Sequence, residues 1–269
     1  MRAPRVPGPS RGEGEPQAES SGWRRWLREA GRAFGIGLSD DQLDLFEAYL
    51  SALLAWNRRV NLTAITEPNE VAALHFLDSL TCLAVSRFDA NARVIDVGSG
   101  AGFPGIPIAI SRPDLHVTLL ESTGRKCRFL DHVITTLALP GVSVDCRRAE
   151  MAGQDPSTRE SFDIAVTRAV AELAVLAELC LPLLKMGGVA LVMKGPKAES
   201  EIARGGGAMA VLGGRLEFAR PLALPVPSGT VERVVLGIRK ISATPQGYPR
   251  APGVPARRPL GIDRGAGGG

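Results

Sequence analysis

The feature that most constrains this chain is a short apolar run that leads directly into a glycine-rich turn. Residues 94–105 read Val-Ile-Asp-Val-Gly-Ser-Gly-Ala-Gly-Phe-Pro-Gly. A short apolar run bounded by such a turn is typical of a buried strand, and glycines let the backbone come close to a ligand. Because ligands of open α/β sheets bind at the first strand-to-helix turn, the sequence predicts a ligand site here.

From this turn onward, short apolar runs alternate with segments of helix length. The runs cover residues 93–97, 117–121, 142–146, 162–167 and 188–193, and helical segments cover 104–110, 124–137 and 171–184. This alternation predicts a mostly parallel sheet with helices on both faces. Two later runs, 215–219 and 231–238, are joined by a proline-rich turn region and predict an antiparallel hairpin at one sheet edge. The predicted fold class is therefore α/β and Rossmann-like.

The residues before the sheet are predicted to be helical. Leu43, Phe46 and Leu50 recur at helical spacing, and Ser39 followed by Gln42 forms a capping box just before them. A further helix is expected after residue 66, with a proline in its first turn, where the missing N–H costs nothing. This region forms the predicted helical subdomain.

Proline and glycine are concentrated in residues 1–16 and 245–269, so both ends look like solvated tails. We expect four segments. They are a disordered extension over 1–20, the helical subdomain over 21–90, the α/β domain with the glycine-rich turn over 91–242 and a basic Pro/Gly-rich tail over 243–269.

The spacing of the glycines distinguishes two ligand classes. A dinucleotide fingerprint requires G-x-G-x-x-G, but the sixth position counted from Gly98 is Phe103. The spacing is instead G-x-G-x-G, through Gly100 and Gly102, with Asp96 two residues before the first glycine. This is the usual loop for S-adenosylmethionine (SAM), whose sulfonium and ammonium groups suit a nearby carboxylate. SAM is therefore the predicted cofactor.

The following strands add candidate cofactor contacts. Glu121 ends the second strand, where an acid can hold both ribose hydroxyls; the alternative is a helix N-cap. Ala149 and Glu150 follow the third strand and could read the adenine edge; the alternative is a charged solvent-facing loop. Arg168 ends the fourth strand and could pair with the methionine carboxylate; the alternative is a structural salt bridge.

Absent features restrict the compartment and the cofactors. The four cysteines include no CxxC pair, which argues against a disulfide scaffold and is compatible with a reducing compartment. The sequence has no apolar stretch of spanning length and no signal-peptide core, so we expect a cytoplasmic protein without a membrane partner. The three histidines show no metal-ligand spacing, so no metal is expected.

The sequence offers no obvious catalytic base, and the catalytic residues stay unassigned. The fourth strand ends without the Asp/Asn-Pro-Pro-Tyr signature of exocyclic-amine methyltransferases, and no cysteine follows a proline as in cytosine C5 enzymes. An acceptor with a free lone pair, such as guanine N7, fits such a site, because positioning could supply most of the catalysis.

The basic residues are compatible with an RNA partner. The formal net charge is +4, and basic side chains can contact phosphates without reading sequence. The candidates are Arg125, Lys126, Arg128, Lys194, Lys197, Arg250, Arg257 and Arg258. For any one of them an ordinary solvated surface is the alternative.

The sequence resembles the bacterial 16S ribosomal RNA guanine-N7 methyltransferase G family, also called glucose-inhibited division protein B. The resemblance covers about residues 23–260. Four stretches carry it, namely residues 61–65 (Asn-Leu-Thr-Ala-Ile), 75–80 (His-Phe-Leu-Asp-Ser-Leu), the turn 96–105, and the tail from 244 through Tyr-Pro-Arg at 248–250 to Arg-Pro-Leu at 258–260. Residues 1–20 and 261–269 have no counterpart in it.

This resemblance implies a class I SAM-dependent methyltransferase that modifies N7 of guanine 527 in 16S rRNA. It implies that Gly98, Phe103, Ala149, Glu150 and Arg168 contact SAM. It also brings four residues toward the pocket that would otherwise be helix-linker or core residues, namely Asn61, His75, Asp78 and Ser79. The expected partner is 16S rRNA in the small ribosomal subunit, and the expected state is a monomer.

Three alternatives stay open. A SAM-dependent methyltransferase of a small molecule is disfavoured by the basic tail, which a small acceptor does not need, and one that acts on another RNA stays open. An NAD-dependent oxidoreductase is disfavoured by Phe103, which interrupts the dinucleotide spacing. A non-catalytic RNA-binding scaffold is disfavoured because Asp96, Gly98, Gly100 and Glu121 are all present.

Overall fold

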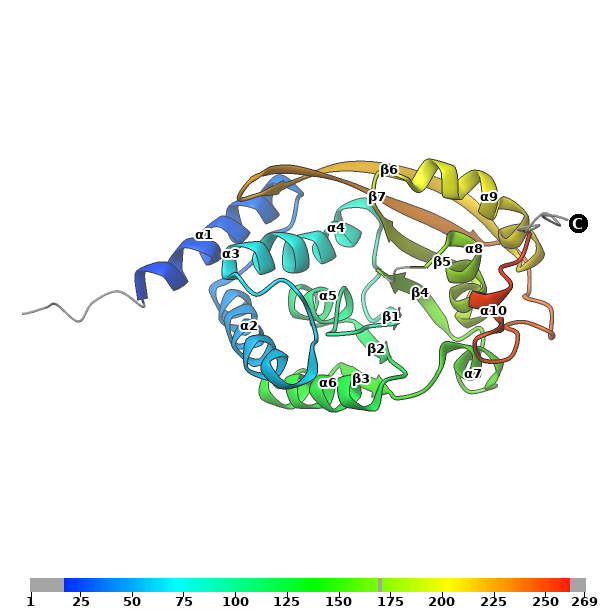
Figure 1. Cartoon of the computed structure of the whole chain (residues 1–269), viewed down its shortest axis with the longest axis horizontal. Coiled ribbons are helices and arrows are strands. Elements are labelled where there is room, and N and C mark those ends of the chain that lie inside the picture. The colour runs from blue at the N-terminus through cyan, green and yellow to red at the C-terminus, as the bar shows by residue number, and fades with distance from the viewer. Residues whose placement is uncertain (1–16, 169–170, 262–269) are drawn as a thin grey trace, which may run out of the picture.

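The computed structural model describes residues 17–168 and 171–261, and its centre is a seven-stranded sheet with strand order β3-β2-β1-β4-β5-β7-β6 (Figure 1). The strands are β1 (Arg93–Val97), β2 (His116–Leu120), β3 (Val142–Asp145), β4 (Phe162–Thr167), β5 (Leu184–Lys194), β6 (Gly214–Val226) and β7 (Gly229–Lys240). Strands β1 to β5 pair in parallel, whereas β7 pairs antiparallel with β5 and β6. The predicted Rossmann-like α/β class with an antiparallel C-terminal hairpin is confirmed.

Helices cover both faces of this sheet. The helices are α1 (Gln17–Ala33), α2 (Asp40–Val60), α3 (Pro68–Val71), the π-helix η1 (Ala72–Leu77), α4 (Asp78–Val85), α5 (Gly105–Ser111), α6 (Gly124–Thr136), α7 (Ala149–Gln154), α8 (Leu173–Cys180), the 3₁₀-helix η2 (Leu181–Leu183), α9 (Ala198–Val211) and α10 (Val254–Arg257). Alternate strand residues divide the core. One apolar cluster joins the sheet to α1, α2, α4, α5 and α6, and the other joins it to α7, α8 and α9. This is the alternation expected for a sheet buried on both faces.

The strand order places the ligand crevice. The chain runs outward from β1 to β3 and then returns to β4 on the other side of β1. Neighbouring parallel strands whose connections leave in opposite directions open a crevice at their carboxyl ends. Here that point lies between Val97, the last residue of β1, and Thr167, the last residue of β4.

The N-terminal helices form as the sequence predicts and pack on the sheet. The Ser39–Gln42 capping box is present, and Leu43, Phe46 and Leu50 are buried. Helix α3 begins with Pro68 and continues through η1 into α4. A π-helical segment inside a longer helix often marks a functional site.

Several boundaries differ from the prediction. Strand β6 continues through Pro221 and Pro225, which were expected in a connecting turn. These prolines are tolerated because β6 is the outer strand of the sheet. Helix α9, whose Gly205–Gly207 run obscured it, was not predicted. Residue 184 begins β5 instead of ending a helix.

The expectation of two solvated tails is wrong for residues 244–260, which we call the C-terminal strap. Thr244, Pro249 and Pro255 are buried, and Tyr248 and Leu260 pack against the apolar cluster beneath α8. Helix α1 begins at residue 17, within the extension expected to be disordered. Residues 1–16 and 262–269 lie outside the described residues, and the four-segment division stays a prediction.

A disulfide joins Cys127 on α6 to Cys146 after β3. Cysteine usage had argued against a disulfide scaffold and for a reducing compartment. The missing CxxC pair says nothing about this disulfide, because α6 packs beside β3 and brings together residues 19 apart in sequence. Cys82 and Cys180 are buried free thiols. The inference of a reducing compartment is therefore not supported by cysteine usage.

Candidate functional site at the carboxyl ends of the strands

The glycine-rich turn lies at the predicted crevice, and its backbone takes conformations that favour glycine. Gly98, Gly100 and Gly102 have φ values of 77°, 60° and 97°. A Cβ on Gly100 would meet only the carbonyl oxygen of Gly98, at 3.9 Å, so this face of the turn is open to an incoming ligand. Gly100 therefore fits a cofactor contact.

Gly102 has a second reason to be glycine. A Cβ there would lie 2.3 Å from Ile106 Cδ1 and 2.8 Å from the Tyr49 hydroxyl. That hydroxyl donates a hydrogen bond to the carbonyl of Ala101. Helix α2 thus holds the turn from behind, and packing alone requires glycine at this position.

Asp96 is fully buried under the turn. Its Oδ2 accepts a hydrogen bond from Gly105 N–H at 2.8 Å, whereas Oδ1 has no hydrogen-bond partner among the described residues. Burial raises the pKa of Asp96 to about 7. A buried carboxylate oxygen without a partner is costly, so the site has capacity for a donor or cation beside the turn.

Glu121 follows β2 and is held by main-chain donors. Its Oε2 accepts from Gly100 N–H at 3.0 Å, and its Oε1 accepts from Thr123 N–H at 2.7 Å. Only 6% of the residue is exposed. Because a carboxylate has about four lone-pair sites, both oxygens keep acceptor capacity for hydroxyl groups. The alternative that Glu121 caps a helix is disfavoured, since the N-cap of α6 is Thr123.

Ala149 and Glu150 begin α7. Glu150 is buried, and its Oε1 accepts a hydrogen bond from Gly253 N–H at 2.7 Å. The Arg148 guanidinium lies 3.5 Å from the same oxygen. The alternative of a solvent-facing loop is therefore wrong for Glu150, and the strap contacts it directly.

Arg168 and Phe103 lie between the glycine-rich turn and a neighbouring pocket. The Arg168 guanidinium lies over the Phe103 ring, 4.9 Å from its centroid. It donates to the carbonyl of Leu74 at 2.9 Å and lies 3.2 Å from His75 Nδ1. The His75 ring stacks on Phe103 with a centroid distance of 4.5 Å. The π-helix η1 thus places its carbonyl and its imidazole against the end of β4.

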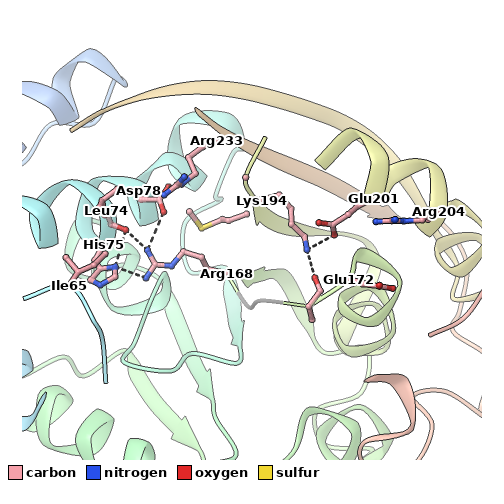
Figure 2. Close-up of a pocket in the computed structure, with 13 residues that line it drawn as sticks. Ile65, Leu74, His75, Asp78, Arg168, Glu172, Lys194, Glu201, Arg204 and Arg233 are labelled. Carbon is pink, nitrogen blue, oxygen red and sulfur yellow. Dashed lines mark hydrogen bonds and ion pairs between the residues drawn. The ribbon is translucent and has the colours of Figure 1, made fainter. Parts of the chain in front are cut away.

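The pocket beyond this wall has a volume of about 690 Å³ (Figure 2). It opens at the ends of β4 and β5 and is lined mainly by charged side chains, with apolar contributions from Ile65, Leu74 and Met193. Its charged residues are Asp78, Arg168, Glu172, Lys194, Glu201, Arg204 and Arg233. Figure 2 shows Arg168, His75 and Asp78 on one wall and Lys194 with Glu201 on the opposite wall.

Asp78 connects two arginines from distant parts of the chain. Its Oδ2 lies 3.4 Å from Arg168 Nη1, and its Oδ1 accepts from Arg233 Nε at 3.2 Å. Asp78 is 2% exposed. Burial raises its pKa, although both guanidinium groups act in the opposite direction. The predicted pairing of Arg168 with a structural carboxylate is thus present beside its contact with the turn.

His75 stays neutral at physiological pH. Burial and the positive charge of Arg168 lower its pKa to about 4. Its Nε2 lies 2.7 Å from the Thr63 hydroxyl, which fixes the ring between the segment at 61–65 and η1. A neutral imidazole with both nitrogens engaged serves here as a wall of the pocket.

The other predicted residues lie in varied settings. Asn61 is exposed at the left-handed C-cap of α2 and is not a lining residue of the pocket. Ser79 is buried and donates to the His75 carbonyl. Lys194 is 8% exposed and paired with Glu201 at 2.7 Å, and Arg250 is paired with Glu178. The exposed RNA candidates are Arg125, Arg128, Lys197, Arg257 and Arg258, and Lys126 is half-buried.

Sequence reasoning missed Arg204 and Arg233. Arg233 lies on β7, 155 residues after its partner Asp78, and Arg204 lies on the unpredicted helix α9. The hairpin of β6 and β7 lies over η1 and α4 (Figure 1), and Arg233 on β7 contacts Asp78 there. For Arg233, the signal would have been the pairing of β7 with β5, which brings this arginine to the pocket.

Within residues 17–168 and 171–261, no helix is long and apolar enough to cross a membrane. In the same residues, no group of three or more His, Cys, Asp or Glu side chains is placed to hold a metal ion.

Known proteins resemble this chain over most of its length. The family model for rRNA small subunit methyltransferase G matches residues 42–223. The ribosomal RNA small subunit methyltransferase G of Roseiflexus sp. (strain RS-1) is 49% identical over 234 residues, which cover 87% of this chain and 98% of the relative. Its namesake in Pelotomaculum thermopropionicum is also 49% identical, covering 87% of this chain and 97% of the relative. The namesake in Roseiflexus castenholzii is 47% identical, covering 85% and 96%.

Proposed function

Because this chain belongs to the rRNA small subunit methyltransferase G family, we propose that it transfers a methyl group from SAM to N7 of guanine 527 in 16S rRNA. The proposed substrate is the small ribosomal subunit, and the proposed location is the cytoplasm, where such subunits are assembled. The proposal separates a cofactor side, at the ends of β1, β2 and β3, from an acceptor side, at the pocket beyond Phe103.

The residues of the cofactor side fit SAM. Gly100 offers an open main chain, Asp96 has a buried oxygen without a partner among the described residues, and Glu121 is a fixed carboxylate at the end of β2. Glu121 would hold the ribose hydroxyls, Ala149 and Glu150 the adenine, and the remaining donors of Arg168 the methionine carboxylate. SAM would supply the electrophilic methyl group.

The acceptor side fits a base that needs no deprotonation. The lone pair of guanine N7 forms the new N–C bond while the methyl–sulfur bond breaks, and its electron pair leaves with the sulfur. No proton moves in this step, so a pocket wall made of neutral His75 and cationic Arg168 is sufficient. The chain's contribution is then orientation, which can supply a large part of a rate enhancement.

Positive charge around the pocket supports a nucleic-acid partner. Arg204 is exposed at its mouth, and Lys197 is the exposed N-cap residue of α9, which follows β5. Such residues position the backbone by phosphate contacts. Because side chains cannot read the deep major groove of A-form RNA, N7 of a paired guanine is inaccessible, and the target must be unpaired or splayed out.

One observation carries the proposal: the ring of Phe103, at the end of the glycine-rich turn, packs against His75 and Arg168, and both of these residues line the pocket. A methyl group presented at the turn therefore has an acceptor pocket directly beside it.

The test uses tritiated SAM and small subunits that lack the modification. After incubation, the RNA is treated with borohydride and aniline, which cleave at N7-methylguanine. We expect label in the RNA and a single cut at guanine 527, with neither in a Glu121→Ala control at limiting SAM.

Two other outcomes would contradict the proposal. Label without cleavage would exclude N7 as the acceptor atom. No label in RNA, together with measurable SAM binding, would favour a small-molecule acceptor.

A further inference from the structure

The C-terminal strap, residues 244–260, lies beside α7 and α8, at the same end of the molecule as the adenine candidates (Figure 1). The family model ends at residue 223, before the strap begins, although the motifs at residues 244–260 are among the stretches that resemble the family. Besides its apolar packing, the strap makes polar contacts with four places, namely residues 159–160 after α7, the C-cap of α9, the helix α7 itself and the helix α8.

The strap begins with contacts to residues 159 and 160. Thr244 N–H donates to Glu160 Oε1 at 3.0 Å, and its hydroxyl donates to the carbonyl of Leu212. Arg159 donates to the carbonyls of Thr244 and Tyr248 at 2.7 and 2.6 Å. These bonds fix where the strap leaves β7.

The middle of the strap is anchored to α8 by an ion pair between the partly exposed Arg250 and a buried carboxylate. Glu178 is fully buried. Its carboxylate accepts three hydrogen bonds from Arg250, from the main-chain N–H at 2.8 Å, from Nε at 2.9 Å and from Nη2 at 2.6 Å. A buried carboxylate without its cation is strongly destabilising, so the strap cannot leave α8 without cost.

The strap then contacts α7. Gln154 donates to the carbonyl of Pro249 at 2.7 Å, and a Cβ on Gly153 would lie 2.7 Å from Pro249 Cγ. Gly253 N–H donates to Glu150 Oε1 at 2.7 Å. The first turn of α7, which carries Ala149 and Glu150, is thus held from the strap and not only from the sheet.

We propose that the strap is a positioning element of the cofactor site, in which the Arg250–Glu178 pair fixes the strap and Gly253 N–H orients the Glu150 carboxylate for the adenosine part of SAM. This inference rests on the proposed function, in which Glu150 contacts the adenine. It replaces the expectation that Arg250 serves RNA binding, because the charge of Arg250 is already paired within the fold.

The experiment compares full-length Arg250→Gln with Arg239→Gln. Arg239 is a matched control, because it forms an Arg–Glu pair with Glu217 and donates to the carbonyl of Gly187, at a place away from α7. Dissociation constants are measured by calorimetry for S-adenosylhomocysteine and for methylthioadenosine, well below the melting temperature of each variant. Methylthioadenosine shares the adenosine part but lacks the amino-acid part.

We expect Arg250→Gln to raise both dissociation constants by the same factor, about five- to tenfold, which lies within the range for the loss of one ordinary hydrogen bond. The KM for SAM should rise in parallel, while kcat at saturating SAM stays within twofold. Arg250→Lys, which keeps the charge next to Glu178, should recover most of the affinity, and Arg239→Gln should bind both ligands normally.

Two results would overturn the role of the strap and leave the cofactor site intact. One is unchanged affinity of Arg250→Gln for both ligands, and the other is a dissociation constant that rises only for S-adenosylhomocysteine. If Arg250→Gln does not fold, the double variant Arg250→Gln with Glu178→Gln, which leaves no unpaired charge on α8, is tested in its place under the same criteria. A Glu150→Gln variant that binds both ligands normally would instead overturn the assignment of Glu150, and the strap inference with it.

Discussion

At the ends of β1 and β2 the polar side chains are carboxylates held by main-chain N–H groups, whereas beyond β4 and β5 they are mostly cations paired with carboxylates from other elements. Asp96 and Glu121 accept from Gly105, Gly100 and Thr123, all within 21 residues in sequence. On the acceptor side, Asp78 pairs with Arg168 and Arg233 across 90 and 155 residues. The cofactor side is local, and the acceptor side is assembled by tertiary structure.

This difference has a functional meaning. Main-chain donors on a strand-to-helix turn are fixed once the strand and helix form, which suits an invariant cofactor. Side chains from η1, β4, α9 and β7 can be altered separately, which suits an acceptor site that must match one RNA. Phe103 is where the two sides meet.

The largest expected effect comes from removing the ring of Phe103, which lies between the two sides. Phe103 is 5% exposed, and Phe103→Ala should lower the free energy of unfolding by about 3–5 kcal/mol, because a large buried ring leaves a cavity. Urea unfolding checks this value, and SAM binding and methyl transfer should both fall.

Phe88→Ala provides the matched control, since Phe88 is 6% exposed and lies in the same apolar cluster. A comparable loss of stability with normal SAM affinity is expected there. If Phe103→Ala left either activity intact, the two sides would not share this wall.

The next effect sharpens the cofactor side. Glu121→Ala should weaken SAM binding by about 1.5–3 kcal/mol, the range for hydrogen bonds to a charged group. Calorimetry of SAM binding measures it, and methyl transfer should recover when SAM is raised to saturation. Unchanged affinity would remove Glu121 from the site.

The positions of the residues proposed for the cofactor side were predictable because these residues follow strands directly. The turn at residues 94–105, Glu121 after the second strand and Arg168 after the fourth all lie at strand ends, as expected, and their contacts to SAM stay a prediction. The family resemblance added His75 and Asp78, which line the pocket. Their partners could not be predicted, because the pairing of Asp78 with Arg233 depends on β7 lying next to β5.

The packing of the strap could not be predicted from the sequence either. Proline and glycine in residues 244–260 resemble a solvated tail by composition, yet Arg250 finds a buried carboxylate on α8. Composition cannot reveal that Glu178, in an apolar helix, needs a cation from 72 residues away.

A smaller effect is the pH dependence of stability that His75, on the acceptor side, should cause. The pKa of His75 is about 4 in the folded chain, against roughly 6.5 when unfolded. The unfolded chain therefore binds an extra proton between these values, and stability falls as pH drops from about 6.5 toward 4.

Urea unfolding at pH 7 and pH 5 tests this dependence. Wild type should lose about 1 kcal/mol more than His75→Gln over this interval, after allowance for solvent screening. Equal losses would mean that the folded imidazole is protonated like an exposed one.

The smallest effect concerns RNA. Arg204→Gln removes an exposed charge at the pocket mouth and should raise the KM for small subunits by about two- to threefold, with a salt slope lower by about one. SAM affinity should not change. Arg25→Gln, in an exposed pair on α1, is the control, and an equal change in both variants would assign the effect to overall charge.

The most direct test of the division into two sides is a crystal structure with S-adenosylhomocysteine bound. We predict that its ribose lies within hydrogen-bond distance of the Glu121 carboxylate and its adenine beside Ala149 and Glu150, with the pocket between Arg168 and Lys194 left for the acceptor. Density for the ligand inside that pocket instead would contradict it.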